Sequence, residues 1–173
     1  MAETSSEEAD RRLRRAGPQD AAAVRALTRA AYAKWVPLIG REPKPMTADY
    51  DHAVVAHRID LMYRNGDLVA LIETILHPDH LLIENLAVAP AAQGQGHGRF
   101  LLGHAEALAV DAGHDLLRLY TNRLFAANIA LYARHGYALE REEAVASGTV
   151  VHMSKRLALP AARPGAPCAG PDR

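Results

Sequence analysis

The chain has 173 residues, enough for one domain with a two-layer core but short for two independent domains. Lysine plus arginine and aspartate plus glutamate each number 20, so the zero formal net charge disfavours a general role in binding nucleic acid or anionic lipid. A single cysteine, Cys168, excludes a disulfide framework, and neither a secretory pattern nor an apolar run of membrane length occurs, so a cytoplasmic protein is expected.

The predicted elements are helical in the first third of the chain and mostly strands afterwards. Apolar residues recur at helical spacing after Pro18, and two prolines interrupt this pattern between residues 41 and 45. The pair Asn65-Gly66 between two apolar runs is a strong β-hairpin signal. In chain order the predicted elements are a strand over Arg12–Arg15, a helix from Pro18 to Ala31, a helix capped by Thr47 and reaching His57 or Asp60, strands over Leu61–Tyr63, Leu68–Leu76 and Leu81–Val88, a helix over Arg99–Ala112, a strand over Leu116–Thr121, a helix over Ala126–His135, and a strand pair over Tyr137–Arg156 that turns near Ser147-Gly148.

A glycine-rich loop, Gln93 to Gly98, lies between a predicted strand and a predicted helix. Free backbone N–H groups and the helix dipole at such a junction favour anions, so a phosphorylated ligand is expected there. A P-loop would require Gly-Lys-Ser/Thr at the helix start, whereas Arg99-Phe100 follows Gly98. A dinucleotide-binding loop fits weakly, because its third glycine comes too early and Asp115 precedes its strand instead of following it.

Two segments carry a family resemblance. In the first, Gln93, Gly96 and Gly98 match the pattern Gln/Arg-x-x-Gly-x-Gly/Ala shortly after a predicted strand. The second holds, in order, Leu119-Tyr120-Thr121-Asn122, Asn128-Ile129-Ala130-Leu131-Tyr132 and His135-Gly136-Tyr137. In these segments, which together span about residues 84–137, the chain resembles the GNAT superfamily of acetyl-CoA-dependent N-acetyltransferases.

The resemblance implies an α/β fold with a mixed, mostly antiparallel sheet of six to seven strands and helices on both of its faces. A single N-acetyltransferase domain is expected over residues 11–157. Residues 1–10 lack apolar side chains to bury and residues 158–173 hold four prolines, so both segments are predicted to be disordered tails.

The resemblance also implies a site for acetyl-CoA as co-substrate. Its pyrophosphate would rest on backbone amides of the glycine loop, and the strand ending at Val88 would splay from its neighbour to receive the pantetheine arm. A backbone N–H near Val88 would stabilise the oxyanion that develops on the thioester. The residues implied in cofactor binding are Leu86, Ala87, Val88, Gln93, Gly94, Gln95, Gly96, His97, Gly98, Arg99, Asn128 and Tyr132. A solvated helix position is an equal alternative for Arg99, and His97 fills a variable position of the motif.

Acetyl transfer to an amine requires a base for the protonated nucleophile and an acid for the departing thiolate. By resemblance, Tyr132 is the expected acid. Glu84, on the central predicted strand, is the first candidate for the base, with an ordinary outward-facing glutamate as the alternative. Glu73 or a water relay could also serve, and Tyr120 stands where some similar enzymes place a carboxylate. The sequence therefore leaves the base open.

The expected reaction is direct transfer, in a ternary complex, to a primary amine of a small molecule or peptide. The acceptor pocket is expected in the helical first third, around Tyr32, Trp35, Met46, Tyr50 and His52, although Tyr32 and Trp35 could equally be helix-packing residues. An acetyl-CoA sensor without turnover and a nucleotide-dependent oxidoreductase are the alternatives. No metal is expected, because His77-Pro78-Asp79-His80 is ordinary turn chemistry, and the last strands could pair between subunits in a homodimer.

Overall fold

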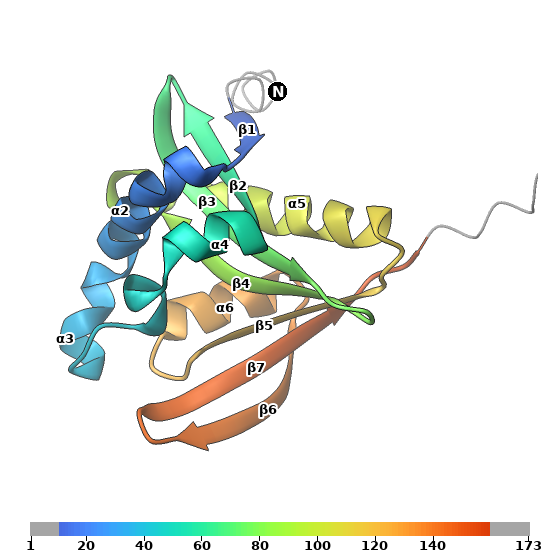
Figure 1. Ribbon diagram of the computed structural model, residues 1–173. Coiled ribbons are helices and arrows are strands. Elements are labelled where there is room, and N and C mark those ends of the chain that lie inside the picture. Colours follow the sequence, from blue (N-terminus) through green and yellow to red (C-terminus); the bar gives the residue numbers. More distant parts are fainter. Residues whose placement is uncertain (1–10, 160–173) are drawn as a thin grey trace, which may run out of the picture.

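A computed structural model describes residues 11–159 of the protein (Figure 1). Its strands are β1 (Arg11–Arg15), β2 (Arg58–Arg64), β3 (Asp67–Leu76), β4 (Leu81–Val88), β5 (Leu116–Asn122), β6 (Ala138–Val145) and β7 (Gly148–Arg156). Its α-helices are α2 (Ala21–Tyr32), α3 (Val36–Ile39), α4 (Tyr50–Ala56), α5 (His97–Asp111) and α6 (Ala126–Arg134), and 3₁₀ turns occupy Pro18–Asp20, Ala33–Trp35, Lys44–Thr47 and Pro90–Ala92. The predicted tails, apart from residues 158 and 159, lie outside this range, as does Cys168.

The seven strands form one sheet in the order β1-β2-β3-β4-β5-β7-β6. Every neighbouring pair is antiparallel except β4 and β5, which run parallel. The α/β fold with a mostly antiparallel sheet, as predicted, is therefore confirmed. No helix in the described part of the chain has both the length and the apolar character needed to cross a membrane.

Helices cover both faces of the sheet, and a separate hydrophobic core lies under each set (Figure 1). Leu61 and Leu71 belong to the core that α2 and α4 cover. Their chain neighbours Met62 and Ile72 belong to the core that α5 and α6 cover. Successive side chains of a strand point to opposite faces of the sheet, so the apolar runs of β2 and β3 can supply both cores.

The second predicted helix is shorter than the sequence indicates. The helix is capped by Asp49, whose side chain accepts a hydrogen bond from the His52 N–H, and not by Thr47. Thr47 ends a 3₁₀ turn, and its hydroxyl donates to the carbonyl of Lys44. The prediction that this helix could reach Asp60 is wrong, because β2 pairs with β3 along its whole length and takes residues 58–60 into the sheet.

The parallel neighbours β4 and β5 are paired over only part of their length. Their ladder contains the three pairs Leu81↔Leu117, Leu82↔Arg118 and Ile83↔Leu119. Beyond these pairs β4 continues to Val88 without β5 as a partner. The predicted separation of this strand from its neighbour is thus confirmed, and it leaves an opening in the middle of the sheet.

Candidate active site

Two cavities adjoin where β4 and β5 separate. One, of about 380 Å³, is lined by the end of β4, the glycine loop and α6, and is called here the loop cavity. The other, of about 480 Å³, is lined by β4, β5 and the β6–β7 hairpin, and is called here the hairpin cavity. Tyr32 and Leu86 line both. These two side chains therefore mark the boundary across which the contents of the two cavities could meet.

The glycine loop leads directly into α5, which begins two residues earlier than predicted. Gly94 and Gly96 have φ angles of 78° and 77°, a conformation that other residues adopt only with strain, and Gly96 is the N-cap of the helix. The first helical N–H groups, from His97 onward, have no acceptor within the helix. A Cβ at Gly98 would lie 3.4 Å from Leu131 and 3.8 Å from Leu86. Glycine here keeps the space between α5, α6 and β4 open.

Gln93 ties the glycine loop to its surroundings through its side chain. Its amide nitrogen donates to the Val88 carbonyl at 3.1 Å, and its amide oxygen accepts from the Lys34 ammonium at 2.8 Å. Lys34 thereby places a cation at the loop cavity, which it lines. No sequence pattern indicated this lysine, because it lies 59 residues from Gln93 along the chain.

Ten of the residues implied in cofactor binding line the loop cavity: Leu86, Ala87, Val88, Gln93, Gly94, Gly96, His97, Gly98, Arg99 and Asn128. Gln95 lines neither cavity. Its carbonyl accepts from Arg11 and its side-chain oxygen accepts from Arg64, so it is held against β1 and β2 instead. Tyr132 lies four residues after Asn128 on α6 and lines the hairpin cavity. One helix therefore contributes a side chain to each cavity.

His97 is a core residue of the first turn of α5 rather than a variable loop position. Its exposed fraction is 1%, and neither ring nitrogen has a hydrogen-bond partner among the described residues. Burial, together with the nearby charges of Arg11 and Arg64, lowers the pKa of the imidazole. Folding therefore favours the neutral form of His97.

We expect His97→Leu to raise the free energy of unfolding at neutral pH by about 1 kcal/mol, because burying polar atoms without partners costs about 1–3 kcal/mol. The ordinary histidine pKa is about 6.5 and the folded value is lower, so the unfolded chain binds more protons just below that pH. The stability contributed by neutral His97 is thus full above about pH 6.5 and decreases as the pH falls further. Urea unfolding between about pH 5.5 and 8 should show a steeper decrease in the parent than in the variant, in which His135, whose pKa is also lowered, still contributes. A less stable variant with an unchanged pH dependence would contradict the prediction.

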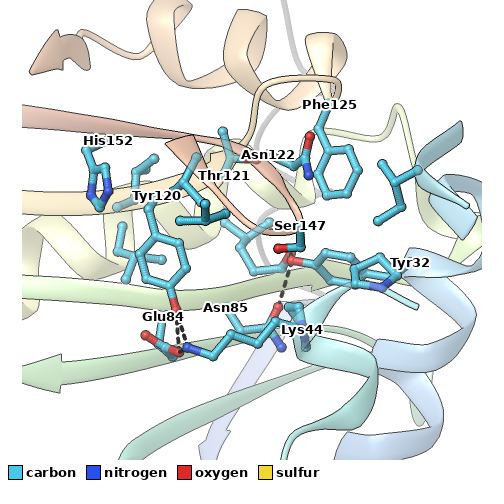
Figure 2. Close-up of a pocket in the computed structure, with 18 of the residues that line it drawn as sticks. Tyr32, Lys44, Glu84, Asn85, Tyr120, Thr121, Asn122, Phe125, Ser147 and His152 are labelled. Atoms are coloured by element: carbon cyan, nitrogen blue, oxygen red, sulfur yellow. Dashed lines mark hydrogen bonds and ion pairs between the residues drawn. The ribbon is translucent and has the colours of Figure 1, made fainter. Parts of the chain in front are cut away.

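In the hairpin cavity, the side chains of Tyr120 and Lys44 meet that of Glu84. The pairing of β3 with β4 skips Glu84, which is the extra residue of a β-bulge, and bulges commonly redirect side chains near functional sites. The Tyr120 hydroxyl donates to the Glu84 carboxylate at 2.5 Å, and the Lys44 ammonium lies 3.6 Å from the same oxygen (Figure 2). Burial and this hydrogen bond raise the pKa of Tyr120. Tyr120, which the sequence suggested as a replacement for a carboxylate, therefore contacts one.

Glu73, the second candidate for the base, has a different environment. It is buried on β3, does not line the hairpin cavity, and lies 2.6 Å from the His57 ring nitrogen. Burial raises the pKa of its carboxyl group, and the contact with His57 opposes that rise. Glu73 is thus paired with His57, and neither residue lines the hairpin cavity.

Asn85 is a buried residue whose role the sequence did not indicate. Its amide nitrogen donates to the hydroxyls of Tyr50 and Thr28 at 3.2 and 3.3 Å. Its oxygen accepts from the Tyr32 hydroxyl at 3.0 Å (Figure 2). These bonds fix Tyr32 at the boundary between the two cavities.

Tyr132, the expected acid, projects from α6 between the core and the hairpin cavity. It is 6% exposed, and burial raises the pKa of its hydroxyl to about 12. This hydroxyl makes no hydrogen bond within the described range, residues 11–159. A protonated phenol is thus available to a ligand throughout the neutral pH range.

The helical first third forms only part of the hairpin cavity. Of the residues expected there, Tyr32 lines it, Trp35 lines the loop cavity and stacks on Phe125 at 4.4 Å, and Met46, Tyr50 and His52 line neither. Sequence patterns did not indicate the opposite wall, formed by Thr121, Asn122, Glu143, Val145, Ser147, Val150 and His152. Across the rim, the Arg41 guanidinium donates to the Ser147 carbonyl at 3.1 Å. Over the described ranges, no group of three His, Cys, Asp or Glu side chains is placed to hold a metal ion.

Comparisons with known proteins agree with this architecture. PaiA N-acetyltransferase from Thermoplasma acidophilum, solved in complex with coenzyme A, superposes with a TM-score of 0.72 at 16% identity over 85% of this chain and 99% of that one. A GNAT family acetyltransferase from Elizabethkingia anophelis with acetyl-CoA bound gives 0.63 at 15% identity over 86% and 99%.

A curated relative is similar over a shorter segment. Mycothiol acetyltransferase from Jonesia denitrificans is 45% identical over 53 residues, which are 31% of this chain and 17% of that protein. The match thus spans less than a fifth of the relative's length. The model of the acetyltransferase (GNAT) family matches residues 23–137, which include the end of β4, the glycine loop, α5, β5 and α6. The chain therefore belongs to the GNAT family of acetyltransferases.

Proposed function

We propose that the protein transfers the acetyl group of acetyl-CoA to a primary amine of a small molecule or peptide, by direct attack in a ternary complex. The observation that carries this proposal is the pair of adjoining cavities. The loop cavity has the chemistry of an anion site, and the hairpin cavity contains a carboxylate. Tyr32 and Leu86 alone stand on the boundary common to both linings, where the acetyl group and the amine would meet.

The loop cavity suits coenzyme A. The unpaired N–H groups of the first turn of α5 and the helix dipole favour the pyrophosphate. Lys34, Arg99 and Arg134 line the cavity, and its described lining contains no carboxylate. Two solved relatives of the same fold hold coenzyme A or acetyl-CoA. We infer that the cationic lining and the amides together bind the phosphate groups of the co-substrate.

Glu84 is the residue that we assign to proton removal from the acceptor. Alkyl amines have a pKa of about 10, so most of the acceptor is protonated at neutral pH. Glu84 and Leu86 both line the hairpin cavity and are separated by two positions on β4, about 7 Å along the strand. An ammonium held by Glu84 thus lies within reach of a thioester at Leu86, and the carboxylate accepts its proton, directly or through water.

Bond formation between nitrogen and the acetyl carbon breaks the bond between that carbon and sulfur. The unpaired end of β4 offers backbone groups near Val88, and one such N–H donor to the developing oxyanion is typically worth about 3 kcal/mol. The departing thiolate has a conjugate acid with a pKa of about 8.5. Tyr132 donates its proton to that sulfur, and the second proton that the nitrogen loses as the amide forms restores the Tyr132 hydroxyl.

Thermal unfolding with acetyl-CoA, coenzyme A, NADH and ATP is the first test. Acetyl-CoA at about 100 times its Kd should stabilise the fold by about 2.7 kcal/mol, which corresponds to about 5–10 °C for a chain of this size. Release of free thiol across a panel of primary amines then measures turnover. Stabilisation by acetyl-CoA without thiol release would indicate the sensor, and stabilisation by NADH alone would indicate an oxidoreductase.

A further inference from the structure

The chain contains three lysines, and their ammonium groups have different environments. Lys34 donates to an amide oxygen of Gln93 at 2.8 Å, and Lys155 donates to Glu106 of α5 at 2.6 Å. Only Lys44 of the three lines the hairpin cavity. It belongs to the 3₁₀ turn Lys44–Thr47, at the rim of that cavity.

The Lys44 ammonium has the surroundings that an acceptor amine would require. It lies 3.6 Å from the Glu84 carboxylate and 3.3 Å from the Tyr120 hydroxyl. It also lies 5.5 Å from the centre of the Tyr120 ring, within the range of a cation–π contact. Figure 2 shows the lysine side chain reaching along the cavity so that its nitrogen points toward both residues. A primary amine of the chain itself is therefore presented to the proposed base.

The lysine stem can move. The Lys44 side chain is 75% exposed, whereas that of Glu84 is 22% exposed. Its four-carbon stem is flexible, and its contact with Tyr120 is a long hydrogen bond. From Glu84, the boundary residue Leu86 is two positions further along β4. A short displacement of the ammonium thus brings it from the base toward the place assigned above to the thioester.

We propose that Lys44 is a site of self-acetylation, an inference that rests on the proposed function. Glu84 removes a proton from the Lys44 ammonium, and the free amine attacks the acetyl carbon of acetyl-CoA. The nitrogen–carbon bond forms, the carbon–sulfur bond breaks, and the thiolate takes a proton from Tyr132, which regains one from the nitrogen as the amide forms. The products are Nε-acetyl-lysine and coenzyme A.

Acetylation changes the hairpin cavity. An acetylated lysine has no charge, so the ion pair with Glu84 is lost. Before modification the Lys44 ammonium competes with an incoming amine for the same carboxylate. After modification the lysine no longer competes for Glu84, so the modified enzyme has a lower KM for its acceptor.

The test uses the full chain, freed of acetyl groups by a lysine deacetylase and then incubated with isotope-labelled acetyl-CoA without any acceptor. Peptide mapping by mass spectrometry measures the label at Lys34, Lys44 and Lys155. Lys34 is the matched control, since it is also exposed but has no carboxylate partner in the described part of the chain. We expect Lys44 to be labelled at least about tenfold faster than Lys34, and Glu84→Gln to remove this advantage.

Two further samples separate the possible outcomes. Lys44→Arg keeps the charge, cannot form the product, and should retain only the slow label at the other two lysines. An added amine that is turned over should slow the labelling of Lys44. Equal labelling of Lys34 and Lys44 in a chain that acetylates added amines would overturn the self-acetylation and leave the proposed function intact. Absence of transfer both to Lys44 and to every added amine would overturn both.

Discussion

Glu84→Gln is expected to lower kcat about 10²- to 10⁴-fold at neutral pH, the range typical of losing a general base. Glutamine has nearly the same shape and keeps an oxygen that can accept the hydrogen bond from Tyr120, so the fold and the coenzyme affinity should change little. It cannot take a proton from an ammonium with a pKa of about 10. The deficit should therefore shrink as the pH approaches that value. Thiol release at saturating amine, measured from about pH 7 to 10, checks both the size of the loss in kcat and its dependence on pH.

Glu73→Gln is the matched control for that experiment. Glu73 is buried beside His57 and lines neither cavity, so its replacement should lower the stability more than the turnover. The reverse pattern, with full turnover in the Glu84 variant and a pH-dependent loss in the Glu73 variant, would move the base to Glu73. Loss of turnover with a constant deficit at every pH would indicate a positioning role for Glu84.

Tyr132→Phe should lower kcat by about 10²-fold while the Kd for acetyl-CoA changes little. The hydroxyl has no partner among the described residues, so removing it leaves no orphaned group in the core. With a pKa of about 12, the phenol keeps its proton across the whole assay range and can protonate the thiolate at each turnover. Above about pH 9 the thiolate leaves without a proton, so the defect should become smaller there.

Tyr137→Phe supplies the comparison. Its ring lies 6.1 Å from that of Tyr132, its hydroxyl is also buried without a partner within residues 11–159, and it lines neither cavity. We expect this variant to keep its turnover. Similar losses in both variants would assign the effect of Tyr132 to packing and would leave the acid to be found elsewhere. Single-turnover measurements with preformed acetyl-CoA complex would show the difference most directly, because they isolate the chemical step.

The elements that the sequence predicted well are those with local causes. Asn65 and Gly66 have φ angles of 51° and 87°, as a tight hairpin turn between β2 and β3 requires, and these two residue types tolerate such angles. Helix α6 and the final hairpin also begin and end close to the predicted residues. The glycine loop was identified because spacing alone separates it from other phosphate-binding loops.

The parts that could not be predicted depend on contacts distant in sequence. Arg41 and Ser147, which meet at the rim of the hairpin cavity, are 106 residues apart. The position of Glu84 depends on a bulge that appears only when β3 and β4 are paired. His97 was expected to fill a variable position of the loop because the helix was predicted to begin at Arg99, two residues too late. Pattern and composition carry no information about such pairings.

The short ladder between β4 and β5 makes the sheet mechanically uneven. Three residue pairs join the strands β1–β4 to the strands β5–β7, whereas the flanking ladders, β3 with β4 and β5 with β7, have seven pairs each. The sheet thus consists of two well-paired halves, β1–β4 and β5–β7, that are joined weakly between β4 and β5, and a ligand in the opening would hold the two halves together. Ligand binding would then suppress the twisting of one half relative to the other, and this takes part of the free energy of binding. The empty protein should therefore exchange its amide protons fastest along the junction between β4 and β5.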